Sequence, residues 1–175
     1  MFFAVNAAAD GSSRFGKEVK NGVQINGNHF AVLPSASFAW LLSSENFMAD
    51  SKIDLFKLRL SWSMTGNDDI GNYTTRQTYT SQNLLGMQGL VRNGIPNSAL
   101  QWETGEKFNG GVDVSAVDDR RTFTADLFHT KTRNMLVYEN ITGGAGFNTI
   151  VTNNGAMHNT GVEATLGIRL INKKN

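Results

Sequence analysis

The chain has 175 residues, a length that fits one domain. Its 16 basic and 15 acidic residues leave a net charge of +1, which excludes the strongly basic surface typical of a nucleic-acid-binding protein. The absence of cysteine excludes disulfides, thiolate metal sites and a cysteine nucleophile. Mean hydropathy is −0.27, and no apolar run approaches the roughly 18 residues that a membrane-spanning helix needs.

The first strand is predicted at residues 2–9, and turn-forming residues follow at 10–13. A polar stretch then contains Asn21-Gly22 and Asn26-Gly27, two dipeptides typical of tight hairpin turns. The second strand is predicted at about 30–42. The turn-forming residues between these two segments predict that the strands run antiparallel.

The third strand, at 57–65 after a connection at 43–54, shows the alternation clearly. Apolar Leu58 and Leu60 alternate with polar Arg59 and Ser61. Successive side chains of a strand point to opposite faces, so this pattern predicts one apolar and one polar face. Residues 66–99 follow as a long polar loop, which is unusual in a compact domain and is typically functional or disordered.

The fourth and fifth strands are predicted at 100–117 and 122–137, joined by a tight turn at 118–121. That turn, Asp118-Asp119-Arg120-Arg121, pairs carboxylates with guanidiniums, but a solvated hairpin turn explains it better than an acid–base site because nothing converges on it. A glycine-rich segment at 142–155 leads to the sixth strand, at 161–170. Short and long connections thus alternate along the chain.

Strands of about ten residues are long for a globular protein but match the 9–11 residues that a tilted strand needs to cross a bilayer. The sequence therefore predicts an all-β fold of antiparallel up-and-down strands. It is expected to form part of the wall of a large transmembrane β-barrel, as an open sheet of about six long strands.

The pattern also assigns residues to faces. One surface of the sheet is predicted to hold Leu58, Leu60, Trp62, Val112, Val114, Phe123, Ala125, Leu127, Val162, Leu166 and Ile168. The other surface is predicted to hold Arg59, Ser61, Asp113, Ser115, Thr124, Asp126, Glu163 and Arg169. We expect Trp40, Trp62 and Trp102 to lie in an interfacial aromatic girdle or to contact lipid.

Several short motifs resemble the barrel of SusC/RagA-type TonB-dependent transporters, in the order in which that family has them. They are Asp10-Gly11-Ser12-Ser13-Arg14-Phe15-Gly16, Leu33-Pro34-Ser35-Ala36-Ser37 with Trp40, Ser44-Glu45-Asn46-Phe47-Met48, Leu58-Arg59-Leu60-Ser61-Trp62 with Thr65-Gly66-Asn67, Pro96-Asn97, Leu100-Gln101-Trp102-Glu103, Asn109-Gly110-Gly111-Val112-Asp113, Arg133-Asn134-Met135-Leu136, and Asn153-Asn154-Gly155-Ala156-Met157-His158-Asn159-Thr160-Gly161-Val162-Glu163. Each motif alone is weak. Their common order over nearly the whole chain is specific.

The resemblance implies that residues 1–175 form a segment from the later part of such a barrel. The chain shows no plug domain and no signal peptide, and its end at Asn172-Lys173-Lys174-Asn175 resembles a periplasmic turn, so we expect a fragment. Plugged transporters of this kind have about 22 strands, and six strands cannot close a barrel.

The resemblance further implies an outer-membrane transporter for nutrient uptake, of glycans or peptides, inactive as this piece alone. Its implied partners are outer-membrane lipid, the rest of the barrel and the plug, a surface SusD-like lipoprotein and the TonB complex. No nucleic acid is expected. This segment is expected to hold at most two of the transporter's loops.

No enzyme activity and no cofactor are expected. The three histidines, His29, His129 and His158, lack metal-ligand spacing, and Gly143-Gly144-Ala145-Gly146 lacks the lysine and βαβ context of a phosphate loop. Ligand contact is predicted for the loop aromatics Tyr73, Tyr79 and Phe147, which could stack on a sugar or peptide.

Two further expectations remain. Arg59, Glu163 and Arg169 would face the plug or a water-filled channel. The alternative to the barrel is a soluble β-sandwich ligand-binding module, in which the same alternation would bury one apolar face against a second sheet.

Overall fold

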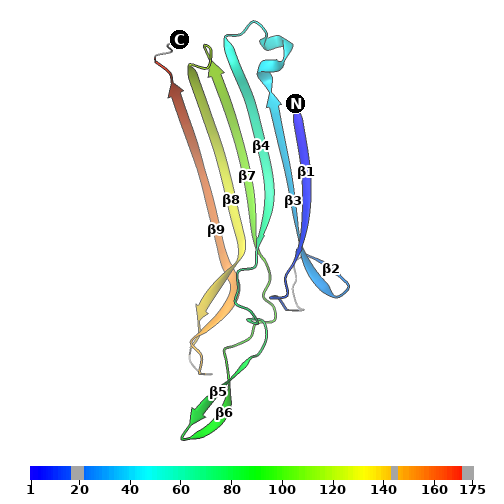
Figure 1. Ribbon diagram of the computed structural model, residues 1–175, viewed down its shortest axis with the longest axis vertical. Helices are drawn as coiled ribbons and strands as arrows, with labels where there is room; N and C mark the ends of the chain where they lie inside the picture. The colour runs from blue at the N-terminus through cyan, green and yellow to red at the C-terminus, as the bar shows by residue number, and fades with distance from the viewer. Residues whose placement is uncertain (17–21, 143–145, 171–175) are drawn as a thin grey trace, which may run out of the picture.

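The computed structural model describes residues 1–16, 22–142 and 146–170 (Figure 1). Part of the Asn21-Gly22 turn, the glycine-rich residues 143–145 and the expected periplasmic turn at 172–175 lie outside these described residues. The described part is all-β, with nine strands and two short 3-10 helices. Its elements are β1 (Phe2–Gly11), β2 (Val23–Ile25), β3 (Asn28–Leu41), η1 (Leu42–Ser44), η2 (Asn46–Met48), β4 (Ile53–Asn67), β5 (Tyr79–Leu84), β6 (Met87–Arg92), β7 (Glu103–Ala116), β8 (Arg121–Asn140) and β9 (Thr149–Ile168).

Six long strands form one antiparallel sheet in the order β1-β3-β4-β7-β8-β9, and β2 pairs with β3 at one end. Each long strand pairs with the long strand next to it in the chain, so the up-and-down prediction is confirmed. The predicted limits were too narrow for most strands. β8 and β9 each have 20 residues, and β9 begins 12 residues before the predicted strand at 161.

Of the turns predicted within the described residues, those at Asn26-Gly27 and 118–121 are confirmed, whereas the turn predicted at 10–13 begins later because Asp10 and Gly11 extend β1 and pair with β3. Asn26 and Gly27 have φ of 50° and 79° and join β2 to β3 through the Ile25–Asn28 pair. Residues 117–120 join β7 to β8, and Asp118 and Asp119 have φ of 55° and 57°. Positive φ is more accessible to Asn, Asp and Gly than to other residues, which explains their places in these turns.

The prediction of a structureless loop at 66–99 was wrong in part, because β5 and β6 form a two-stranded hairpin within it. Its turn residues Leu85 and Gly86 have φ of 50° and 82°. The hairpin projects from one end of the long sheet (Figure 1). Three connections lie at that end, between β1 and β2, β4 and β7, and β8 and β9, so the expectation of at most two loops was too low.

The strand register confirms the predicted faces. Leu58 pairs with Val112, Val112 with Ala125 and Ala125 with Ala164, and directly paired residues point to the same side of a sheet. The rows of paired residues that alternate with these lie on the opposite side of the sheet. They join Asp113 to Lys57 and Thr124, and Asp126 to Gly111 and Glu163. Arg169 lies one residue beyond β9, so the ladder does not assign it to a face.

The long sheet is a single layer that leaves its apolar face open. Phe3, Val162 and Leu166 on this face are 70%, 71% and 69% exposed. The accessible surface of 12508 Å² exceeds the roughly 8,400 Å² expected for a compact 19.1 kDa domain. Within the described residues the only other sheet is the β5–β6 hairpin, so the β-sandwich alternative receives no support.

Candidate functional site at the loop-bearing end

The buried apolar residues of the described chain gather where the long connections meet the sheet. They are Phe15, Ala31, Ile70, Leu100 and Trp102, and Leu100 is fully buried. The rings of Phe15 and Trp102 lie 5.0 Å apart at 49°. The expectation that Trp102 contacts lipid or joins a girdle was therefore wrong, because its indole packs inside this loop core.

Asn153 of β9 attaches the segment before β7 to the neighbouring strands. Its Nδ2 donates to the carbonyls of Gln101 at 2.9 Å and Asn134 at 2.8 Å, and its Oδ1 accepts from the Gln101 amide at 2.9 Å. The β8–β9 register shifts beside this point, and Asn134 has a φ of 55°. The irregularity thus turns backbone groups toward Asn153, and one side chain satisfies three of them.

The first loop is attached to the long loop by Arg14. Its Nη1 donates to the Asp68 carbonyl at 3.0 Å and lies 3.8 Å from the Asp68 carboxylate. The hydroxyl of buried Thr75 donates to the Arg14 carbonyl at 2.9 Å. Segments 61 residues apart in sequence are thereby held together, so the loops form a defined surface.

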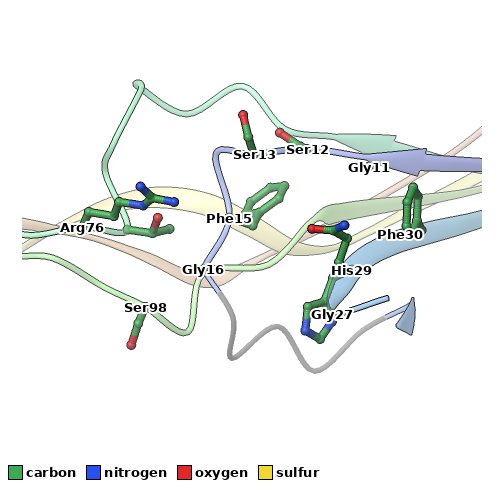
Figure 2. Close-up of a pocket in the computed structure, with 12 residues that line it drawn as sticks. Gly11, Ser12, Ser13, Phe15, Gly16, Gly27, His29, Phe30, Arg76 and Ser98 are labelled. Carbon is green, nitrogen blue, oxygen red and sulfur yellow. The ribbon is translucent and has the colours of Figure 1, made fainter. Parts of the chain in front are cut away.

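A recess of about 810 Å³ opens beside this surface (Figure 2). It is lined by Gly11, Ser12, Ser13, Phe15, Gly16, Gly27, Asn28, His29, Phe30, Thr75, Arg76 and Ser98. Among the described residues that line the recess, hydroxyls, an amide, an imidazole and a guanidinium surround two phenyl rings, and none of these residues carries a carboxylate. This lining suits a polar ligand that is neutral or anionic.

The three predicted ligand-contact residues lie at this end of the molecule but do not share one recess. Tyr73 is 63% exposed, with a φ of 66°, and lines a smaller recess of about 260 Å³ together with Tyr138 of β8. Tyr79 begins β5 and is 60% exposed, whereas Phe147 is half-buried, and neither lines that recess. Tyr138, 76% exposed, is the aromatic that sequence reasoning missed. Ligand contact by Tyr73, Tyr79 and Phe147 stays a prediction.

A charged cluster ties three strands together on the polar face. The Arg59 guanidinium donates to both carboxylate oxygens of Asp113, at 2.7 and 3.0 Å, and to Asp126 at 3.2 Å. Gly111 makes the room, because a Cβ at this position would overlap the Arg59 and Asp126 side chains. Arg59 thus faces the polar side as predicted, and its charge is matched within the sheet.

Two tryptophans lie on the apolar face about 13 Å apart along the strands, because Trp40 pairs with Leu58 and Trp62 lies four residues further along β4. Trp40 Nε1 donates to Glu45 at 2.8 Å, near the end of the sheet with the β3–β4 and β7–β8 connections. Trp62 Nε1 donates to Glu106 at 3.1 Å, nearer the end that carries the β5–β6 hairpin. An indole with an apolar ring and a hydrogen-bonded N–H suits the interface between a membrane and water. Girdle or lipid contact by Trp40 and Trp62 stays a prediction.

No cluster of three or more His, Asp or Glu side chains able to hold a metal ion occurs among the described residues. Helices long and apolar enough to cross a membrane are likewise not found in the part of the chain that the structure describes.

Comparison with known proteins agrees with this architecture. A family described as "TonB dependent receptor-like, beta-barrel" matches residues 5–172. TonB-dependent receptor P3 of Formosa agariphila is 32% identical over 174 residues, which cover 97% of this chain and 16% of that protein. TonB-dependent receptor SusC of Bacteroides thetaiotaomicron is 32% identical over 174 residues, covering 93% of this chain and 16% of SusC.

Among solved structures, the RagAB peptide importer in its closed-closed state superposes with a TM-score of 0.84 and 26% identity, over 98% of this chain and 18% of the matched chain. The chain therefore spans about a sixth of the length of the curated relatives that it matches. Since the family match runs through all six long strands, the chain belongs to the TonB-dependent receptor β-barrel family, a family of outer-membrane receptors and transporters rather than enzymes.

Proposed function

We propose that this chain forms neighbouring strands in the wall of a TonB-dependent outer-membrane transporter that imports glycans or peptides. The relatives named SusC and RagAB peptide importer support this proposal. At about 4.8 Å per strand, six strands would supply roughly a quarter of a 22-stranded wall.

The observation that carries the proposal is the uncovered apolar face. Along β4, the residues of this face run from Phe56 to Met64, and the intervening residues are polar or charged from Lys57 to Ser63. These nine residues make eight steps of about 3.4 Å, some 27 Å of strand, which at a tilt of about 40° spans about 21 Å and is close to the roughly 25 Å apolar band of a transmembrane barrel. Lipid would cover this face and leave the other toward the lumen.

The lumen face would meet water and the plug, and its matched charges around Arg59 would keep the wall rigid there. Substrate would be recognised by the loop surface, through Tyr73, Tyr79 and Phe147, with Tyr138 beside Tyr73. A surface SusD-like lipoprotein and the TonB complex would be the partners of the whole transporter, as in the resemblance. No covalent chemistry is required of this segment.

The proposal is tested by a chimera of the RagAB importer in which residues 1–175 replace the matching segment. The chimera is expected to fold into the outer membrane and to retain peptide import that depends on TonB. Leu60→Lys should reduce the amount of folded barrel, because a lysine on the lipid face costs about 2–4 kcal/mol at mid-bilayer. Ser61→Lys, one residue away on the other face, is the matched control and should leave the amount unchanged.

Equal effects of the two lysine substitutions would contradict the proposed lipid face. The isolated chain gives a second test, because open apolar surface and unpaired edges favour aggregation. We expect it in inclusion bodies, and a monodisperse monomer that purifies without detergent would contradict the proposal.

A further inference from the structure

The apolar face changes character abruptly toward the loop end of β7, β8 and β9. On β8 the residues of this face are Phe123, Ala125 and Leu127, and then His129, Lys131 and Arg133. The ladder sets Lys131 opposite Glu106 of β7 on one side and His158 of β9 on the other. Polar and cationic side chains of three strands therefore meet on the face that is elsewhere apolar.

The contacts in this patch leave one cation unmatched. Glu106 accepts from the Trp62 indole at 3.1 Å and lies 3.7 Å from Arg133, so its charge is engaged on both sides. His129 Nδ1 is 2.6 Å from the Thr160 hydroxyl, and the His129 and His158 rings are 6.3 Å apart. Lys131 is half-buried, and the described residues offer it no ion-pair partner within 4.0 Å.

We propose that Lys131, Arg133, His129 and His158 form a site for the phosphate group of an outer-leaflet lipid. The inference rests on the proposed function, since it requires this face to lie against the bilayer. Arg and Lys are the side chains that bind phosphate best, and an imidazole N–H adds a hydrogen-bond donor.

The height of the site matches the headgroup layer. Successive residues on one face of a strand are about 6.6 Å apart, so Lys131 lies roughly 13 Å along β8 from Leu127. With a strand tilt of about 40°, this becomes about 10 Å above the last apolar side chain. The polar layer of a leaflet is roughly 5–8 Å thick, so His129, about 5 Å above Leu127, lies inside it. Lys131 lies about 2 Å or more beyond this layer, and its long stem can bend back to the phosphate.

The indole of Trp62 on β4 lies close to the level of His129 on β8, and β7 separates these two strands. It lies in the same row of paired residues as Phe108 and His129, one step below Lys131 on the same face. Tryptophan is enriched at the membrane interface, so the aromatic and the cationic residues independently indicate one boundary.

The test uses the natural polypeptide that carries this chain, purified from outer membranes in mild detergent. Its recovery as a heat-modifiable barrel in that fraction is scored first. The protein is then exchanged into micelles containing diphosphoryl lipid A or its dephosphorylated form, and bound lipid is counted by mass spectrometry. Lys131→Gln should lower retention of the diphosphoryl form about fivefold, the factor expected for one surface cation near an anionic headgroup.

Lys107→Gln is the matched control, because Lys107 is an exposed lysine beside Glu106 on the opposite face. It should leave retention unchanged, and Lys131→Arg should restore it. Equal retention by K131Q and K107Q, or equal retention of the two lipids, would overturn this inference while leaving the barrel intact. Displacement of lipid A by millimolar inorganic phosphate would reassign the patch to free anions. Absence of a heat-modifiable barrel would overturn the proposed function itself, and this site with it.

Discussion

Replacing Asn153 with alanine should release the segment before β7 from the sheet. The side chain makes three hydrogen bonds, two with the backbone of Gln101 and one with the carbonyl of Asn134. Alanine keeps the β9 backbone but removes every one of these bonds. The Gln101 amide and two carbonyls then lose their partner in a half-buried place.

The size of the effect follows from that count. A hydrogen bond contributes about 0.5–1.5 kcal/mol to stability, and a buried group left unpaired adds to the loss. Three bonds therefore correspond to about 3 kcal/mol of local stability, or roughly a hundredfold change in the opening equilibrium. The loss is local because the strand ladder on either side is unchanged.

Hydrogen exchange measured by mass spectrometry on the outer-membrane protein would report this opening. Peptides covering residues 96–102 should exchange roughly a hundredfold faster in N153A, whereas those from β4 should not change. Asn154→Ala is the matched control, since that neighbouring side chain makes one exposed hydrogen bond, with Glu139 at 2.8 Å. Equal exchange at 96–102 in N153A and N154A would refute the role assigned to Asn153.

Three further substitutions test other parts of the account. Leu100→Ala should lower the free energy of unfolding by about 2–5 kcal/mol, because Leu100 is fully buried, whereas Leu90→Ala at a 77% exposed position should change it by under about 0.5 kcal/mol in the same urea titration. Gly155→Ala should cost about 1–3 kcal/mol, since a Cβ there would lie 2.7 Å from Met135 Cβ, and Gly89→Ala, whose nearest neighbour is 3.8 Å away, serves as its control. Arg59→Met should cost about 1–2 kcal/mol, discounted because the side chain is 33% exposed, and an Arg59→Met barrel as stable as one carrying Lys107→Met would show that the ion cluster is dispensable.

The sequence was sufficient to predict the strands inside the apolar band and their faces. There, neighbours such as Leu58 and Arg59 lie on the apolar and the polar face respectively, so the period of two is kept at each step. Hairpin turns could also be predicted where Asn, Asp or Gly has a positive φ, as at Asn26 and Asp118.

Outside the apolar band, the sequence has no regular alternation of apolar and polar residues from which a strand could be predicted. The first part of β9 mixes polar and apolar residues on both faces, as Val151, Asn153 and Asn154 illustrate, so no alternation indicates a strand. The β5–β6 hairpin has the same character, and its turn begins with Leu85 at positive φ, which no turn propensity favours.

The loop core could not be predicted for a different reason. Phe15 comes from the β1–β2 connection, whereas Ile70 and Trp102 come from the two ends of the β4–β7 connection, and these residues meet only after the sheet has formed. The sequence shows that Leu100 and Trp102 alternate with polar residues, but it does not show what covers these two side chains. Burial in a loop core and contact with lipid therefore could not be distinguished from the sequence. Tyr138 was missed because it lies in a strand, whereas ligand contacts were sought in loops.

The most direct test of the membrane-wall assignment compares neighbouring cysteines on β9, introduced in the outer-membrane protein. Residues 1–175 contain no cysteine, so Leu166→Cys and Thr165→Cys can each be studied alone once any cysteines elsewhere are replaced by serine. Bimane attached at 166 should be quenched by brominated lipid and shielded from a water-soluble quencher, and bimane at 165 should show the reverse. Equal quenching of both positions by the aqueous quencher would mean that no face of this sheet lies in lipid, and would contradict the account.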